Sequence, residues 1–166
     1  MKDTTISPEI ERSRASLQPQ LNATPRILLV DDDASTRELN TLVLTLSGYE
    51  VDAAIDGAAG WEALQAKPYD LLITDNSMPK VTGVEMIKML RAAHMALPVI
   101  MATRTLPTEE LTRHPLLQPD ATLVRPYTLR KMLNTVAEVL RVAYGVREPI
   151  TPPPDGQNQP STDDLR

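Results

Sequence analysis

The chain has 166 residues, 42% of them hydrophobic, which is enough for one ordinary buried core but not for two full domains. Its net charge of -5 and its scattered Lys and Arg residues provide no basic field for nucleic-acid phosphates, so we expect no direct contact with nucleic acid. Cysteine is absent, which excludes disulfides, thiolate metal sites and cysteine nucleophiles, and the two histidines cannot supply a multi-histidine metal centre.

The two ends of the sequence differ from its middle. Residues 1–24 are polar and lack the apolar stretch of a secretory signal, and residues 147–166 are polar and rich in Pro. No apolar run approaches membrane-spanning length. We therefore expect a folded domain over 25–146 between a flexible N-terminal extension and a disordered tail, in a cytoplasmic protein without membrane insertion.

Short apolar runs alternate with helical patterns between these ends. Strands are predicted at Arg26–Val30, Glu50–Ala54, Asp70–Thr74, Pro98–Ala102 and Ala121–Val124. Helices are predicted at about 35–47, 57–66, 84–93, 108–113 and 128–145. Strict alternation demands right-handed crossovers, which predicts a three-layer α/β/α fold with a doubly wound parallel sheet.

The helix predicted over 35–47 has the clearest signals. Ser35 and Glu38 have the spacing of a capping box. The apolar residues recur at the spacing of an amphipathic helix: Leu39, Leu42, Val43 and Leu46. In the next two helices we expect Trp61 to pack in the core, and Val84, Ile87 and Leu90 to form one apolar stripe.

Polar residues follow four of the predicted strands. They are Asp31, Asp32 and Asp33 after the first strand, Asp75 after the third, Thr103 after the fourth and Arg125-Pro126 after the fifth. The DDD run alone is also typical of a solvated turn with helix-capping acids. In doubly wound sheets, however, the ligand site lies beyond the carboxyl ends of the strands, so all four positions are expected to converge.

Such a constellation suits phosphoryl chemistry. Carboxylates that lie together need a cation, and an oxygen-only site suits Mg²⁺. One carboxylate can then attack phosphorus, while a hydroxyl and a cationic side chain hold the transferred oxygens.

Four segments of the sequence carry a family resemblance. They read ILLVDDD at 27–33, DLLITDNSMPKVTG at 70–83, PVIMATRT at 98–105 and RPYT at 125–128. Over about Arg26 to Gly145 the chain resembles the CheY-like receiver domain of two-component response regulators. This resemblance implies a flavodoxin-like sheet of five parallel strands in the order 2-1-3-4-5.

The resemblance implies a role for each candidate site residue. Asp75 would be the phosphoacceptor, Thr103 the switch hydroxyl and Arg125 the cation that contacts the phosphoryl group. The Mg²⁺ cofactor would be held by Asp31, Asp32, Asp75 and the backbone carbonyl of Ser77.

The resemblance also implies partners. A sensor histidine kinase or a histidine phosphotransfer protein would donate the phosphoryl group. A downstream protein would bind the face formed by the fourth and fifth helices and the fifth strand. Because the sequence after Gly145 is too short for an output domain, we expect a single-domain regulator that signals through protein–protein contacts. A diffusible effector, a phosphorelay intermediate and a phosphate sink all remain open.

Three positions depart from the family pattern. Arg125 stands where the family has an almost invariable Lys, and a guanidinium differs from an ammonium in reach and in donors. Arg104 stands where the family prefers Ala or Gly, and could screen Asp75, contact the phosphate or extend into solvent. Thr122 replaces the Tyr or Phe that reports phosphorylation, and Tyr127 is expected to pack rather than to substitute for that switch.

Two other functions remain open. The three departures are compatible with a phosphorylation-independent pseudo-receiver, a binding module that keeps the fold. Asp31 and Asp33 also match the D-x-D spacing of haloacid-dehalogenase-like phosphatases, although that family needs a longer chain and leaves Asp75 without a role. We expect Asp33 to be a helix N-terminal charge outside the site. The main hypothesis is a self-phosphorylating phosphoacceptor domain, not an enzyme that turns over small substrates.

Overall fold

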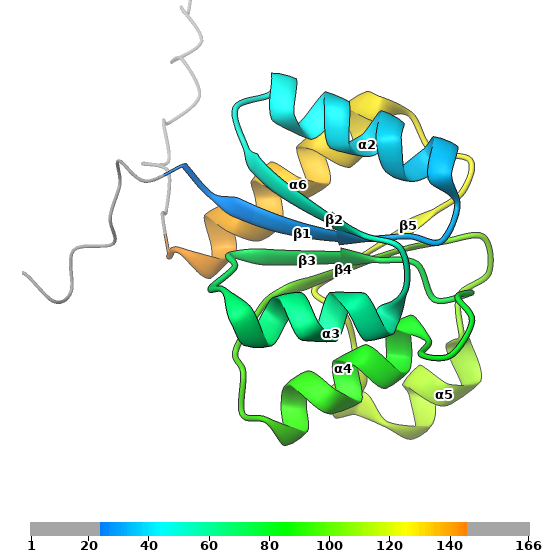
Figure 1. Ribbon diagram of the computed structural model, residues 1–166. Coiled ribbons are helices and arrows are strands. Elements are labelled where there is room, and N and C mark those ends of the chain that lie inside the picture. The colour runs from blue at the N-terminus through cyan, green and yellow to red at the C-terminus, as the bar shows by residue number, and fades with distance from the viewer. Residues whose placement is uncertain (1–23, 146–166) are drawn as a thin grey trace, which may run out of the picture.

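The computed structural model describes residues 24–145, in which strands and helices alternate (Figure 1). The strands are β1 (Arg26–Val30), β2 (Glu50–Ala54), β3 (Leu71–Thr74), β4 (Val99–Thr103) and β5 (Ala121–Val124). The helices are α2 (Ala34–Leu46), α3 (Gly57–Ala66), α4 (Gly83–Ala92), α5 (Thr108–Arg113), the 3₁₀ helix η1 (Pro115–Leu117) and α6 (Leu129–Ala143). Apart from residue 24, the predicted N-terminal extension and Pro-rich tail lie outside the described residues.

The strands of residues 24–145 form a parallel sheet in the order β2-β1-β3-β4-β5. Helices α2 and α6 cover one face, and α3, α4 and α5 cover the other (Figure 1). Side chains alternate between the faces of a strand, so Ile27 and Leu29 of β1 join the core under α2 and α6. Leu28 and Val30 join the core on the opposite face. The predicted doubly wound fold with flavodoxin-like strand order is confirmed.

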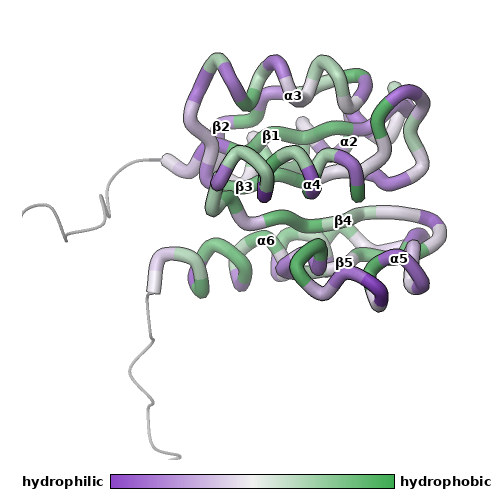
Figure 2. Tube along the Cα trace, turned by 90° about the horizontal axis from the view of Figure 1, so that it is seen from below, coloured by the Kyte–Doolittle hydropathy of each residue, from purple (hydrophilic) through white to green (hydrophobic). Residues whose placement is uncertain are grey.

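The sequence pattern predicted the strand bounds to within one residue. Strands β1, β2 and β5 have the predicted bounds, whereas β3 begins at Leu71 and β4 is shifted by one residue to Val99–Thr103. Strands of a covered parallel sheet are apolar on both faces, and such continuous apolar runs are easy to recognise. Figure 2 shows this as hydrophobic colour along β1 and β4.

Helix α2 follows the first group of acids, and the prediction that Ser35 caps it is wrong. The cap is Asp33, whose side chain accepts a hydrogen bond from the Thr36 N–H at 2.7 Å. Asp33 has the extended backbone that a cap requires, with φ -77° and ψ 112°, whereas Ser35 already lies inside the helix. The expectation that Asp33 is a helix N-terminal charge agrees with this cap.

The buried face of α2 also differs from its predicted apolar stripe. Three residues of that stripe are 49%, 56% and 78% exposed, namely Leu39, Leu42 and Leu46. The helix instead buries Asn40 and Leu44 against the sheet, with Val43 partly buried. A period of 3.6 residues identifies an amphipathic helix, but α2 has apolar residues on two sides, and the period does not indicate which side the sheet covers.

The other helices agree with their predicted patterns. Val84, Ile87 and Leu90 of α4 are buried in one cluster, and Trp61 of α3 packs partly buried against it. The side chain of Thr128 caps α6. Each α-helix begins after a loop that follows a strand, so the sheet and its helices hold these loops in place.

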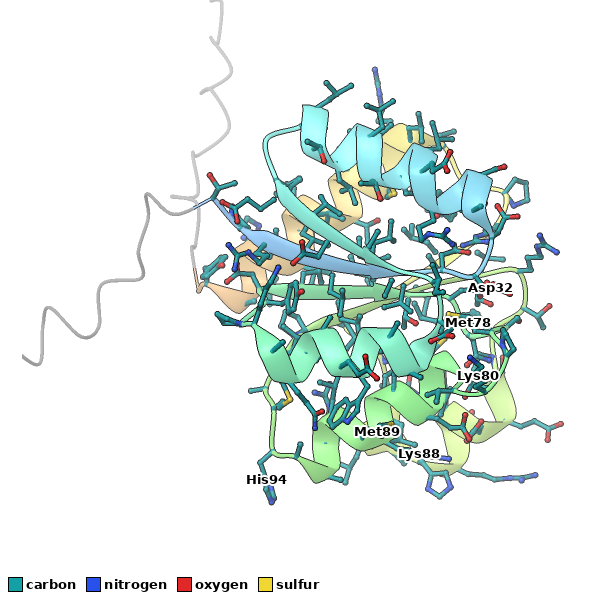
Figure 3. All side chains as sticks on the ribbon, viewed as in Figure 1. Asp32, Met78, Lys80, Lys88, Met89 and His94 are labelled. Carbon is teal, nitrogen blue, oxygen red and sulfur yellow. The ribbon has the colours of Figure 1, made fainter. Side chains whose placement is uncertain are left out.

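The two histidines are exposed. In Figure 3, His94 lies far from the end of the sheet at which Asp32, Met78 and Lys80 are labelled. Among the described residues, no helix has the length and apolar character needed to cross a membrane.

Candidate functional site

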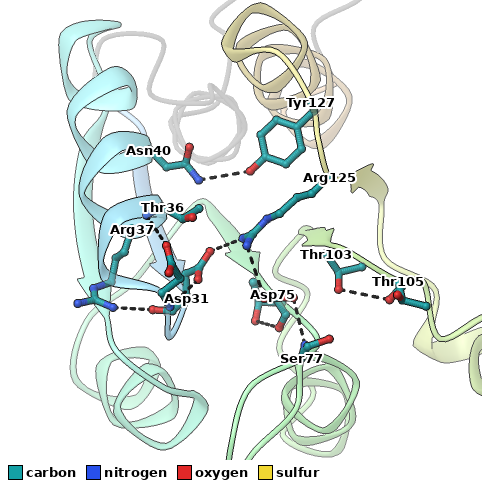
Figure 4. Close-up of polar contacts among 12 residues, drawn as sticks. Asp31, Thr36, Arg37, Asn40, Asp75, Ser77, Thr103, Thr105, Arg125 and Tyr127 are labelled. Carbon is teal, nitrogen blue, oxygen red and sulfur yellow. Dashed lines mark hydrogen bonds and ion pairs between the residues drawn. The ribbon is translucent and has the colours of Figure 1, made fainter.

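Three carboxylates meet where β1 and β3 end. These strands are neighbours, with Val30 paired to Thr74, so the residues that follow them, Asp31 and Asp75, emerge side by side (Figure 4). Together with Asp32, they offer carboxylate oxygens that all lie within 4.8 Å of one another. Asp31 and Asp75 are buried, whereas Asp32 is exposed. The convergence of acids predicted from the strand ends is therefore present in the structure.

The carboxyl group of Asp31 lies in the most buried part of this cluster. Burial raises the pKa of Asp31, and the Asp33 N–H and the charge of Arg125 oppose that rise. One carboxylate oxygen, Oδ1, accepts a hydrogen bond from the Asp33 N–H at 2.9 Å. The side chain of Arg37 donates to the Asp31 backbone carbonyl at 2.8 Å, which anchors the start of α2 to the site.

The loop after β3 holds Asp75 in a fixed position. The Ser77 N–H donates to Asp75 Oδ1 at 3.1 Å, and the Asn76 side chain accepts a hydrogen bond from the Val84 N–H at 3.1 Å. A Cβ atom added at Gly83 would lie 2.6 Å from the Asp75 carbonyl oxygen, so only glycine fits this close approach. The loop thus brings the Ser77 N–H next to Asp75, whereas the predicted role of the Ser77 carbonyl as a metal ligand stays a prediction.

Arg125 joins the cluster from the end of β5. Its Nη2 atom donates to Asp31 Oδ2, and its Nη1 atom lies 3.8 Å from Asp75 Oδ2 (Figure 4). Burial opposes the charge of this guanidinium, but the attraction of Asp31 raises the pKa of Arg125 overall. The Arg125-Pro126 peptide bond is cis, and the Nε atom of Arg125 is buried without a hydrogen-bond partner.

Thr103, the last residue of β4, is fully buried at the end of the strand that pairs with β3. Its hydroxyl donates to the Thr105 carbonyl at 3.3 Å, and Figure 4 shows it turned toward Thr105. A rotation of the side chain would be required for this hydroxyl to contact a group carried by Asp75. Arg104, the next residue, is exposed, and its charge contributes to the lowered pKa of Asp33 after the hydrogen bonds from Thr36.

Tyr127, the aromatic residue near the site, lies on the face of the sheet that α2 and α6 cover. Thr122 is exposed on β5, whereas Tyr127 packs partly buried against the core beneath α2 and α6. The Tyr127 hydroxyl accepts a hydrogen bond from Asn40 Nδ2 at 3.3 Å (Figure 4). Sequence reasoning missed Asn40, Arg37 and Asn76. Asn40 could have been found as a polar residue on the buried face of α2, but the sequence does not indicate which face of that helix is buried.

Comparisons with known proteins agree on one family. The model of the response regulator receiver domain matches residues 27–137. The probable transcriptional regulatory protein SilR of Salmonella typhimurium is 35% identical over 116 residues, which are 70% of this chain and 51% of that protein. The chain thus spans about half the length of the curated relatives it matches first.

Two solved structures are similar to the chain over most of the described residues. The chemotaxis protein CheY4 of Vibrio cholerae has a TM-score of 0.65 and 30% identity, over 70% of this chain and 99% of that one. The response regulator TrrA of Thermotoga maritima, solved in complex with Mg(2+)-BeF, has a TM-score of 0.63 and 27% identity, over 70% of this chain and 99% of that one.

Proposed function

The chain belongs to the response regulator receiver family, and we propose that its Asp75 accepts a phosphoryl group from a phosphohistidine partner in a Mg²⁺-dependent reaction. The observation that carries this proposal is the convergence of three carboxylates within 4.8 Å of one another, with a partly buried guanidinium beside them. A solvated turn would not bury two of those acids next to an arginine.

The residues at the site fit a divalent cation. The donor set consists of carboxylate oxygens without histidine or cysteine, which suits a hard cation such as Mg²⁺. Asp31, Asp32, Asp75 and the backbone carbonyl of Ser77 would hold it. When bound, Mg²⁺ would coordinate phosphoryl oxygens and offset their negative charge. The Mg(2+)-BeF complex of TrrA, a relative of the same fold, supports this assignment.

The chain's own side chains perform the transfer. A carboxylate oxygen of Asp75 attacks phosphorus, an acyl phosphate forms, and the electron pair of the broken P–N bond remains on the imidazole of the donor. The Ser77 N–H holds the Asp75 carboxylate in a single orientation during the attack. Thr103 rotates away from Thr105 to donate to one phosphoryl oxygen, and Arg125 pairs with another.

The proposed partners are those that the resemblance to receiver domains implies. The donor is a sensor histidine kinase or a histidine phosphotransfer protein, and a downstream protein binds the face formed by α5, β5 and α6. A diffusible effector, a phosphorelay intermediate and a phosphate sink differ in the lifetime of the acyl phosphate, which kinetics would separate. The single-domain architecture and the cytoplasmic location stay predictions.

A second candidate function is a phosphorylation-independent pseudo-receiver. It is favoured by Arg125, whose guanidinium is paired with Asp31, and by Thr122, which provides no aromatic ring on β5. The phosphatase hypothesis has less support, because Asp33 caps α2 through Thr36 and does not belong to the carboxylate cluster.

Intact mass spectrometry tests the proposal. The wild type, incubated with Mg²⁺ and acetyl phosphate, should gain the mass of one phosphoryl group, and Asp75→Asn should gain none. Asp33→Asn is the matched control, because it removes a neighbouring acid outside the cluster, and it should gain the same mass as the wild type. If wild type gains no mass while a partner still binds Asp75→Ala, the pseudo-receiver function replaces this one.

A further inference from the structure

Arg125 offsets part of the negative charge of the carboxylate cluster. Its side chain is 14% exposed and that of Asp31 is 2% exposed, so the ion pair between them is nearly shielded from water. The same guanidinium lies 3.8 Å from Asp75 through its other terminal nitrogen. One side chain therefore faces two of the three clustered carboxylates, as Figure 4 shows.

The other cations near this end of the sheet have different partners. Arg37 donates to the backbone carbonyl of Asp31 and not to its carboxylate. Lys80 pairs with Asp56, the residue that caps α3. Within residues 24–145, Arg125 is the cation that forms an ion pair with the carboxylate cluster.

Both carboxylate oxygens of Asp31 are engaged. Oδ1 accepts from the Asp33 N–H at 2.9 Å, and Oδ2 accepts from Arg125. A divalent cation at this carboxylate would lie beside the partly buried positive charge of Arg125, where limited contact with water strengthens repulsion. The planar fork of an arginine reaches two carboxylates at once, whereas the ammonium of a lysine is a single point of charge.

We propose that Arg125 is the built-in cation of the acidic pocket, and that it must leave Asp31 before a divalent cation can bind there. Arg125 and Mg²⁺ then compete for one carboxylate, and by linkage each weakens the binding of the other. Once released, the guanidinium is free to pair with a phosphoryl group on Asp75. This inference rests on the proposed function, since it concerns the same site.

Isothermal titration calorimetry with MgCl₂ tests the competition. Arg125→Met should bind Mg²⁺ at least about tenfold more tightly than the wild type, within the ~5–150-fold range of typical coupling between two ligands. Arg125→Lys should lie between the two. Arg104→Met is the matched control, because it removes an exposed arginine that lies outside the carboxylate cluster, and it should change the affinity much less.

A second measurement covers the effect of the substitution on folding. Arg125→Met leaves Asp31 buried without its partner, so its Tm in a chelating buffer should fall below that of the wild type. Added Mg²⁺ should then raise the Tm of this variant by more than that of the wild type, because tighter binding stabilises more. If Arg125→Met does not fold, the affinity of Arg125→Lys decides the question alone.

Two results overturn the inference. One is a Mg²⁺ affinity that is the same in the Arg125 variants and the wild type, and the other is an increase in Mg²⁺ affinity in Arg104→Met as large as that in Arg125→Met. The outcome for the proposed function is separate. Phosphoryl mass on wild-type Asp75 together with unchanged Mg²⁺ affinity rejects the competition and leaves the proposed function standing. Tighter binding in Arg125→Met without phosphoryl mass on the wild type supports the competition and rejects phosphorylation.

Discussion

The packing of α2 predicts a large loss of stability for one leucine-to-alanine substitution and a small one for another, two positions away. Leu44 is 0% exposed in the core beneath α2 and α6, and Leu42 is 56% exposed. Truncating a buried leucine to alanine removes its transfer free energy and leaves a cavity, so Leu44→Ala should lower the free energy of unfolding by ~3 kcal/mol. For a domain of this size, that loss corresponds to a Tm decrease of roughly 10 °C.

Urea denaturation followed by circular dichroism measures both variants under one set of conditions. Leu42→Ala is the matched control, with the same substitution in the same helix, and it should change the free energy of unfolding by about 0.5 kcal/mol or less. The reasoning is refuted if Leu42→Ala destabilises as much as Leu44→Ala. That result would mean that the side of α2 that carries Leu42 faces the sheet, and that Asn40 does not contact Tyr127.

Substitutions at three further positions test other parts of the structure. Burial and the hydrogen bond to Asp52 raise the pKa of Tyr69 from its ordinary value of 10.0 to about 12. The protonated phenol therefore stabilises the folded state fully below pH ~10, and this stabilisation is lost as the pH rises toward 12. The stability difference between wild type and Tyr69→Phe, from urea titrations at several pH values, should be constant up to pH ~10 and shrink above it. Gly83→Ala should lower stability by about 1–3 kcal/mol and slow phosphorylation, because its Cβ would lie 2.6 Å from the Asp75 carbonyl oxygen; unchanged urea and phosphorylation curves would contradict this. Thr103→Ser should retain phosphorylation by acetyl phosphate and Thr103→Ala should slow it, whereas equal rates in the two variants would exclude a role for the hydroxyl.

The sheet could be predicted from the sequence because its central strands are covered on both faces. Continuous apolar runs marked β1, β3 and β4, and alternation with helices specified parallel pairing. Parallel pairing placed Asp31 and Asp75 at the same edge of the sheet. The resemblance to receiver domains added the strand order, and the structure confirms it.

The details around the carboxylates required three-dimensional information. Ser35 and Asp33 are both good capping residues, and only the backbone conformation shows that Asp33 is the cap. The pairing of Arg125 with Asp31 depends on the direction of a long side chain that leaves β5, which no sequence spacing encodes. The hydrogen bond between Asn40 and Tyr127 joins residues that are 87 positions apart in the sequence, and it depends on which side of α2 faces the sheet.

Chemical mapping of the phosphorylated residue tests the central claim most directly. After incubation with Mg²⁺ and acetyl phosphate, borohydride reduces an aspartyl acyl phosphate to homoserine, which peptide mass spectrometry locates in the sequence. The account predicts homoserine at position 75 in the wild type and none in Asp75→Asn. Homoserine at position 31 or 32, or no reduced residue in a wild-type sample that binds Mg²⁺, would contradict it.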